Sequence, residues 1–421
     1  MDRTRPLIRK NRGLVMQAHT YEDVLNFVDE ENIKFIRLAF FDVFGNQKNI
    51  AIMPGELRRA FEVGISFDAS AITGFGEEVK SDLFLKPDPT SLSIIPWRPL
   101  DGGVCRMFCD ICYPDGTPFE KDTRYMLRRA VRTARESGIS VNIGPEIEFY
   151  VFKLDDKGEQ TQEPIDHASY MAVAPADRGE NLRRDICFTL LEMGITPEAS
   201  HHEQGPGQNE VDFRYSDPLT SADNTTMFKW AVRNLADQNG MWADFSPKPL
   251  RDAAGNGMHL NMSVKSTDGT DYTDSFMAGI MRHIKEITLF LNPTPKSYER
   301  FGQLEAPYYI SWSDENRSQL IRIPADPSGG RRIELRSPDP MANPYLAYTL
   351  LIYAGLDGIS RKMAPERPMN INLYRADPDL TGKLEKLPSH FEEAVQYAVD
   401  SEFVRKHVSE ECLAAYCHRD R

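Results

Sequence analysis

Residues 144–152 read GPEIEFYVF and place two glutamates in a run that otherwise favours a β-strand. Because side chains alternate between the two faces of a strand, Glu146, Glu148 and Tyr150 share one face, and the apolar residues between them form the other. If the apolar face packs on helices, the acidic face meets either water or a cavity. For this stretch alone, both interpretations stay open.

Three later stretches, at residues 207–215, 257–264 and 331–337, repeat this design. Their polar faces carry Glu210, Asp212 and Arg214, then His259, Asn261 and Ser263, and finally Arg332, Glu334 and Arg336. A single strand of this kind is explained by a solvated surface. Four of them predict a sheet that curves around a polar cavity.

The segments between these strands carry helix signals. Apolar periodicity and end signals predict helices within residues 20–33, 54–64, 121–138, 178–194, 221–240, 274–292 and 343–359. Two strands around a DVFGN turn are predicted within residues 34–52. A stretch rich in proline and glycine at residues 87–103 predicts a domain boundary.

The composition excludes several classes of protein. The chain has 421 residues, of which 41% are hydrophobic and 27% charged, which is typical of a soluble globular protein. Its net charge is −13 without a basic block, which argues against nucleic-acid binding. No apolar run approaches the roughly 20 residues that span a bilayer. With six cysteines and no secretory signal, we expect reduced, structural thiols and a cytoplasmic location.

The residue types on the polar faces indicate a chemistry. Several carboxylates in one cavity repel each other unless cations neutralise them. Glutamates with a single histidine suit Mg²⁺ or Mn²⁺ better than zinc. The arginines on the same strands need anions, either carboxylates or phosphates. Without an obvious serine or cysteine nucleophile, this set favours phosphoryl transfer, and the absence of a GxxxxGK[ST] motif excludes a P-loop enzyme.

The motifs together resemble those of the glutamine synthetase family, of the bacterial type I kind. They are GPEIEFYVF (144–152), HHEQGPGQNEVDF (201–213), GNGMHLNMSV (255–264), NRSQLIRIP (316–324) and RRIELRSPDPMANPYLA (331–347), and they occur in the family's order. The match covers roughly residues 18 to 375.

The resemblance implies an α+β fold with two domains. We expect a β-grasp domain at residues 17–103 and a larger catalytic domain at residues 104–421, with a curved antiparallel sheet packed by helices. It also implies a dodecamer of two hexameric rings, whose active sites are shared between neighbouring subunits.

The resemblance further implies roles for single residues. The metal ligands are Glu148, Glu203 and Glu210 beside the amino acid, and Glu146, His259 and Glu334 beside the ATP phosphates. The amino-acid contacts are Gly255, Arg300 and Arg336, and the ATP contacts are Asn261, Ser263, Arg322 and Arg332. Arg317 stabilises the transferring phosphoryl group, Glu305 shields the intermediate, and Asp68 of a neighbouring subunit deprotonates ammonium beside Tyr170 and Glu203.

The implied activity is the ATP-dependent ligation of ammonia to the γ-carboxylate of glutamate through γ-glutamyl phosphate. One alternative is a γ-glutamyl ligase that uses an organic amine such as methylamine, ethanolamine or a polyamine. A lesser alternative is a ring-forming regulatory protein with weak activity.

Three departures from the family's usual pattern bear on the choice between these activities. Asn261 stands where the family usually has a second histidine, Ala71 replaces a serine in the ammonium pocket, and Ala254 replaces an asparagine in the substrate loop. Tyr374 falls where some relatives carry a modified tyrosine, and we expect it to be unmodified. We also expect His201 and His202 to be structural rather than metal ligands, and Asp212 to pair with Arg214.

Overall fold

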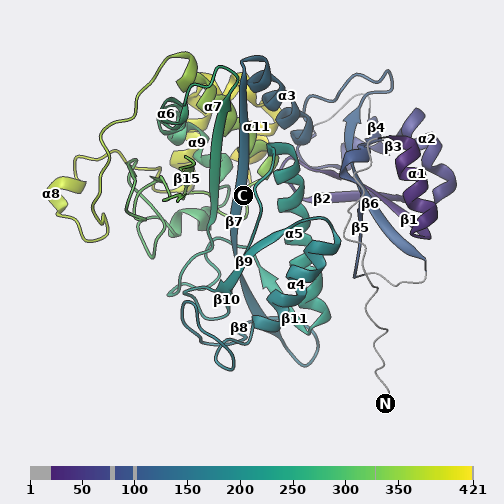
Figure 1. The fold of residues 1–421 in the computed structure, drawn as a ribbon, viewed down its shortest axis with the longest axis horizontal. Coiled ribbons are helices and arrows are strands. Elements are labelled where there is room, and N and C mark those ends of the chain that lie inside the picture. Colours follow the sequence, from purple (N-terminus) through teal and green to yellow (C-terminus); the bar gives the residue numbers. More distant parts are fainter. Residues whose placement is uncertain (1–19, 76–80, 98–101, 328, 420–421) are drawn as a thin grey trace.

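The computed structural model describes residues 20–75, 81–97, 102–327 and 329–419, and these form two parts (Figure 1). Residues 17–19 of the expected first domain lie outside the described residues. The first part consists of α1 (Tyr21–Glu30), β1 (Ile33–Phe41), β2 (Gln47–Ile52), α2 (Leu57–Glu62), β3 (Ile65–Asp68), β4 (Asp82–Pro87), β5 (Ser93–Ile94) and β6 (Gly103–Cys112). Its sheet has the order β2-β1-β6-β4-β3, and β5 pairs with β6.

Local sequence explains this first part. Helix α1 begins with a capping box, in which Thr20 accepts a hydrogen bond from the backbone N–H of Asp23 and Asp23 accepts one from Thr20. Between β1 and β2, the buried Asp42 carboxylate accepts the backbone N–H groups of Phe44 and Asn46, and Gly45 supplies a left-handed φ of +79°. The predicted helix and hairpin are therefore confirmed.

The larger part is built on a nine-stranded sheet. Its strands are β7 (Ile139–Leu154), β8 (Gln160–Pro164), β9 (Pro197–His202), β10 (Gln208–Phe213), β11 (Met241–Asp244), β12 (Met258–Ser266), β13 (Trp312–Ser313), β14 (Ile321–Arg322) and β15 (Ile333–Leu335). The order is β13-β14-β15-β12-β7-β10-β9, and β8 and β11 also pair with β7.

The four strands with polar faces are neighbours in this sheet, in the order β15-β12-β7-β10. All three pairings between them are antiparallel. The register places His259 opposite Glu146, Glu210 opposite Glu148, and Asn261 opposite Glu334. Opposed residues of antiparallel strands lie on the same face, so the predicted polar face of one curved sheet is confirmed.

Helices cover the apolar face of this sheet. Those that contact its strands are α3 (Thr123–Glu136), α4 (Glu180–Glu192), α5 (Pro218–Gln238) and α6 (Thr273–Leu291). Helices α7 (Pro344–Ser360), α9 (Phe391–Asp400), α10 (Glu402–His407) and α11 (Glu410–Cys417) pack against other helices, and α8 (Pro378–Thr381) lies on a loop away from the sheet (Figure 1). Ile147, Phe149 and Val151 of β7 are completely buried. Helices α6 and α7 cross closely because Gly279 has no side chain: a Cβ atom there would come within 2.1 Å of the Ala354 carbonyl oxygen.

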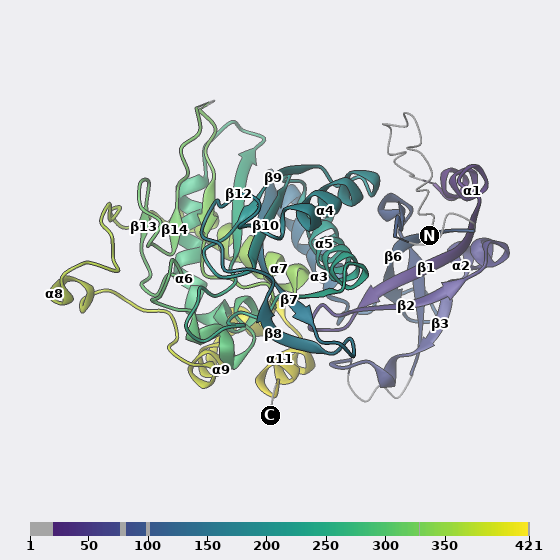
Figure 2. The same ribbon diagram turned by 90° about the horizontal axis from the view of Figure 1, so that it is seen from below.

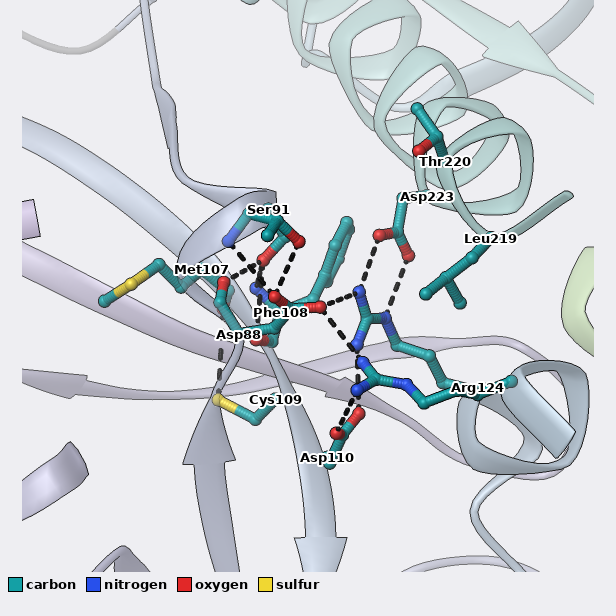
Figure 3. Close-up of polar contacts among 12 residues, drawn as sticks. Asp88, Ser91, Met107, Phe108, Cys109, Asp110, Arg124, Leu219, Thr220 and Asp223 are labelled. Atoms are coloured by element: carbon teal, nitrogen blue, oxygen red, sulfur yellow. Dashed lines mark hydrogen bonds and ion pairs between the residues drawn. The ribbon is translucent and has the colours of Figure 1, made fainter. Parts of the chain in front are cut away.

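The two parts meet at α3 and α5, which lie between the large sheet and the first part (Figure 2). Arg124 of α3 is 1% exposed and forms ion pairs with Asp88 at 2.8 Å, with Asp110 at 3.0 Å and with Asp223 of α5 at 2.8 Å (Figure 3). Asp88 follows β4 and Asp110 belongs to β6, so a single guanidinium joins the first sheet to helices α3 and α5. The expected division at residues 103 and 104 falls at the start of β6, a strand of the first sheet.

Two further expectations concern membrane-spanning segments and the state of the cysteines. Among the described residues, no helix has the length and apolar character needed to cross a membrane. All six cysteines are free, and burial raises the pKa of the Cys105 and Cys412 thiols to about 12. Thiols with such a high pKa are poor nucleophiles, in keeping with a structural role.

Candidate active site

Three predicted ligands form a compact group at the middle of the polar face. The ligand atoms of Glu146, His259 and Glu334 lie within 4.8 Å of one another. His259 Nδ1 is 3.6 Å from a Glu146 oxygen and 3.8 Å from a Glu334 oxygen. The group comes from three adjacent strands, β7, β12 and β15, so the sheet itself fixes its geometry. Two carboxylates and one imidazole form a donor set that fits a divalent cation.

Polar partners orient this group. The Asn261 amide donates to Glu146 at 2.8 Å and accepts from Arg332 Nε at 3.0 Å. Burial raises the pKa of Glu146, but hydrogen bonds from His259 and Asn261 outweigh this effect and lower it to about 2. Glu334 is completely buried and accepts from both Arg322 and Arg336. Both glutamates are therefore held in their ionised form.

The second predicted group is acidic and lacks comparable cations. Burial and the neighbouring Glu148 carboxylate raise the pKa of Glu203 to about 8, and burial with Asp212 raises that of Glu210. Glu148 is oriented by the Gly257 N–H at 2.8 Å and by Gln208 at 3.0 Å. Buried carboxylates that repel each other are the setting in which a bound divalent cation is stabilising, so these residues fit a second metal.

Histidines border this second group in two different ways. His201 lies 3.4 Å from a Glu203 oxygen and 3.2 Å from a Glu210 oxygen. The ligand atoms of His201, Glu210 and Asp212 also lie within 4.8 Å of one another. By contrast, His202 is completely buried between Asp166 and the backbone oxygen of Glu203, which is a structural position.

The expected pair of Asp212 and Arg214 does not form. Arg214 lies 3.8 Å from Glu198 instead, and its side chain is 69% exposed. Asp212 Oδ1 is buried without a hydrogen-bond partner, and burial raises the Asp212 pKa to about 8. The alternation of the strand explains the error: both residues share a face, but Arg214 lies beyond the end of β10, where its long side chain reaches solvent.

Two buried arginines lie beside the two groups of predicted metal ligands. Arg300 is 3% exposed and donates to the Ser337 carbonyl at 3.1 Å. Gly255 lies directly against it, since a Cβ atom at Gly255 would come within 2.6 Å of the Arg300 Cγ atom. Arg336 is 1% exposed and lies 3.5 Å from the Glu305 carboxylate. These guanidiniums can receive a carboxylate substrate next to the two groups of predicted metal ligands.

Glu305 and Arg317 lie on exposed loops at the edge of the site. Glu305 has a φ of +72°, an uncommon conformation for a residue with a side chain. Arg317 is exposed and near enough to Tyr170 to influence its hydroxyl electrostatically. Tyr170 in turn packs edge-on against His201, with ring centroids 5.6 Å apart. Ser263 follows Asn261 on the same face of β12 and is half-buried.

Asp68 and Ala71 lie apart from this group within the single chain. Asp68 ends β3 in the N-terminal sheet, and its carboxylate accepts the N–H and hydroxyl of Ser70 (Figure 1). Both Asp68 and Ala71 are exposed. An active site that uses Asp68 would therefore need the N-terminal part of another chain.

Two residues at the site, Gln208 and Asn256, were not singled out from the sequence, and Tyr374 was considered only as a position that some relatives modify. Tyr374 is near Arg336 and Arg300: burial raises the pKa of its hydroxyl, and the two guanidiniums oppose this shift. Gln208 Nε2 donates to Glu148 and to Asn256 Oδ1, and Asn256 is completely buried beside Gly255. The GQN and GNG motifs contain Gln208 and Asn256, but only the folded chain shows that they touch.

Comparisons with known proteins decide the family. The glutamine synthetase β-grasp domain matches residues 32–114, and the glutamine synthetase catalytic domain matches residues 120–421. The chain belongs to the glutamine synthetase family. Enzymes of this family are ATP-dependent ligases that use divalent metal ions, and the chain is a ligase of this class.

Curated glutamine synthetases are similar over nearly the whole chain. That of Methanosarcina mazei is 43% identical over 412 residues, which cover 94% of this chain and 92% of the relative. That of Clostridium saccharobutylicum is 42% identical over 416 residues, which cover 95% and 94%. Among solved structures, a GmaS/ADP complex has a TM-score of 0.84 at 27% identity and covers 93% of both chains.

Proposed function

We propose that this ligase joins ammonia to the γ-carboxylate of glutamate, converting ATP to ADP and phosphate. The observation that carries the proposal is the pair of acidic groups on one sheet face, with Arg300 and Arg336 buried beside them. The identity to curated glutamine synthetases, at 42–43%, supports ammonia as the nitrogen donor.

The proposed reaction has two steps, and different residues act in each of them. Arg300 and Arg336 orient glutamate, so that a γ-carboxylate oxygen attacks the γ-phosphorus of ATP and ADP leaves. Asn261, Ser263, Arg322 and Arg332 contact the nucleotide, and Arg317 stabilises the charge of the transferring phosphoryl group. Glu305 then covers γ-glutamyl phosphate, which water would otherwise hydrolyse.

The second step forms the carbon–nitrogen bond. Asp68 of a neighbouring chain, with Glu203 and Tyr170, attracts ammonium and removes a proton. Ammonia then attacks the γ-carbonyl carbon, and phosphate leaves. Divalent cations held by the two acidic groups would neutralise carboxylate and phosphate charge, and we propose Mg²⁺ or Mn²⁺.

A second candidate is a γ-glutamyl ligase that uses an organic amine. Two of the similar solved structures are of GmaS, a γ-glutamylmethylamide synthetase. Ala71 favours the same direction, because it places a methyl group where the family's serine would offer a hydroxyl. One lost hydrogen bond is worth about 0.5–1.5 kcal/mol, up to about tenfold in affinity.

The deciding experiment measures phosphate release from ATP and glutamate with ammonia, methylamine, ethanolamine or a polyamine. We expect the highest kcat/KM with ammonia, at an elevated KM, and Ala71→Ser should lower that KM by up to about tenfold. The exposed Ala51 of β2 offers a matched control, Ala51→Ser, which should leave the kinetics unchanged. A strong preference for an alkylamine, together with ammonia kinetics unchanged in Ala71→Ser, would favour the second candidate.

The proposal also includes an assembly and a location. We propose a dodecamer of two hexameric rings. Asp68 is remote from the predicted metal ligands of its own chain, so a site that uses it needs a neighbouring chain. Free thiols throughout the chain suit a reducing cytoplasm. Light scattering or native mass spectrometry of the full chain would test the assembly.

A further inference from the structure

A cavity at the junction of the two parts lies outside the active site. Its volume is about 360 Å³, and its walls come from the loop after β4, from α3 and from the start of α5. The lining residues are Asp88, Thr90, Arg128, Val131, Arg132, Arg135, Asp217 and Leu219. None of them belongs to the polar face of the large sheet, so this junction cavity needs an explanation of its own.

Three arginines give the cavity its chemistry. Arg128, Arg132 and Arg135 are spaced by four and three residues, which places them on one face of α3. Arg128 is engaged, with ion pairs of 3.0 Å to Asp88 and 3.1 Å to Asp110. Arg132 and Arg135 are exposed, and within the described part of the chain neither has an ion-pair partner.

The two carboxylates of the lining are already in use. Asp88 accepts from Arg124, Arg128 and Thr90. Asp217 is the N-cap of α5 and accepts two backbone N–H groups of its own helix. The cavity therefore presents more unmatched positive than negative charge, next to the apolar side chains of Val131 and Leu219.

We propose that the junction cavity binds a small organic anion through a carboxylate or phosphate group held by Arg132 and Arg135. The planar guanidinium matches the two oxygens of either group. A volume of about 360 Å³ lies within the range of about 300–1,000 Å³ found for small-molecule pockets. The site goes beyond the proposed function, since its residues take no part in the ligation.

Binding there would also affect the whole chain. The walls belong to both parts, and Arg128 shares Asp88 and Asp110 with Arg124. Figure 3 shows Arg124 and these two aspartates. A ligand that touches both parts stabilises their docked arrangement in proportion to its occupancy. We therefore expect bound anions to raise the melting temperature of the assembled protein.

The test measures binding to the full-length protein by calorimetry, with inorganic phosphate, a nucleoside monophosphate and a dicarboxylate such as malonate as probes. A competing ATP analogue held at saturation closes the nucleotide part of the active site. Binding at the amino-acid part is recognised because it persists in the double variant of Arg132 and Arg135 described below. A response to phosphate-bearing probes alone, or to the dicarboxylate alone, identifies which oxyanion the site prefers. The melting temperature is followed in parallel.

Variants then locate the binding. Arg132→Gln with Arg135→Gln should weaken binding at least about tenfold, because charge-assisted hydrogen bonds are lost. Arg129→Gln, an exposed change on the same helix but outside the lining, should leave binding unchanged. The pair Arg58→Gln with Arg59→Gln, on exposed α2, matches the change in net charge. Failure of every probe to bind, or equal binding by the Arg132 and Arg135 double variant, would overturn the proposal.

Discussion

At the scale of single residues, Glu334 shows how a strand position becomes a site. Its carboxylate is completely buried yet lies among Arg322, Arg336 and His259. Burial raises the pKa of Glu334, but the charges of Arg336, His259 and Arg322 together outweigh this effect, and the net shift is downward. An ionised carboxylate at this depth is stable only with such partners, and it is therefore available to a cation.

We predict that Glu334→Gln reduces ATP-dependent phosphate release at least about a hundredfold, because the amide cannot supply the charge of a metal ligand. Manganese binding, measured by calorimetry on the same protein, should weaken as well. Glu159→Gln in an exposed turn provides the control and should match the unchanged protein. Full turnover of Glu334→Gln, or turnover of the native enzyme in excess chelator, would contradict a metal-dependent site.

At the scale of elements, the segment between β8 and α4 depends on Asp166. This buried carboxylate accepts the N–H groups of Ala168, Arg178 and Gly207 and bonds the His202 ring at 2.9 Å. It thus closes the segment that carries Tyr170. His202 also bonds the backbone oxygen of Glu203, so the pair positions two walls of the proposed ammonium pocket.

The Asp166–His202 pair should make stability depend on pH. Burial opposes both charges, but their mutual hydrogen bond lowers the pKa of Asp166 and raises that of His202. The Asp166 contribution is present above its unfolded pKa of about 3.9 and is lost as the pH falls below it. The His202 contribution is fully present below about 6.5 and is lost as the pH rises through the higher folded pKa.

Asp166→Asn should therefore lower the free energy of unfolding most between about pH 4 and 6.5, by about 3–5 kcal/mol, as expected when a buried pair loses one partner. Urea unfolding at several pH values would measure this. Asp156→Asn, in the exposed turn before β8, should change stability by less than about 0.5 kcal/mol. A loss that is constant across pH would show that hydrogen bonds, and not the ion pair, explain the effect.

At the scale of the whole molecule, one buried arginine fastens the first sheet to helices α3 and α5 of the larger part. Arg124 neutralises Asp88, Asp110 and Asp223, which come from three separate elements (Figure 3). Tyr345 of α7 adds a hydrogen bond of 2.6 Å to Asp223. Removing the guanidinium would leave Asp223 without an ion-pair partner among the described residues, whereas Asp88 and Asp110 would keep Arg128. A buried carboxylate that loses its counter-charge costs more than the pair is worth.

We predict that Arg124→Gln lowers the free energy of unfolding by about 3–5 kcal/mol. Arg129 is an exposed residue of the same helix, and Arg129→Gln should change the free energy of unfolding by less than about 0.5 kcal/mol. Chemical denaturation followed by fluorescence would compare the two. Similar stability of Arg124→Gln and Arg129→Gln would show that the network contributes little.

The position of Asp68 leads to a prediction about assembly. If Asp68 serves a neighbouring chain's site, Asp68→Ala and Arg317→Ala are each inactive alone but leave some complete sites when mixed. We expect mixed assemblies to recover a measurable fraction of the native phosphate release. No recovery in assemblies that mass spectrometry shows to be mixed would argue against a shared site.

The sequence by itself determined the four strands with polar faces and helices α1 to α7, whereas helices α8 to α11 were not predicted from it. Alternation at period 2 in residues 144–152 and in three later stretches required one polar and one apolar face, and burial of Ile147 and Phe149 left no other packing. The order of the motifs was enough for the family resemblance. Most candidate ligands could therefore be identified from the sequence, because the strand period and the residue type are local properties.

Only the tertiary structure decided which polar residues meet. Pairing of β12 with β7 and β15 brought His259 to Glu146 and Glu334, residues more than 70 positions apart in the chain. The folded chain also places Arg214 away from Asp212 and brings Tyr374 near Arg300 and Arg336. It leaves Arg132 and Arg135 beside a cavity without an ion-pair partner among the described residues. These outcomes depend on register and on contacts between distant segments, which no local pattern encodes.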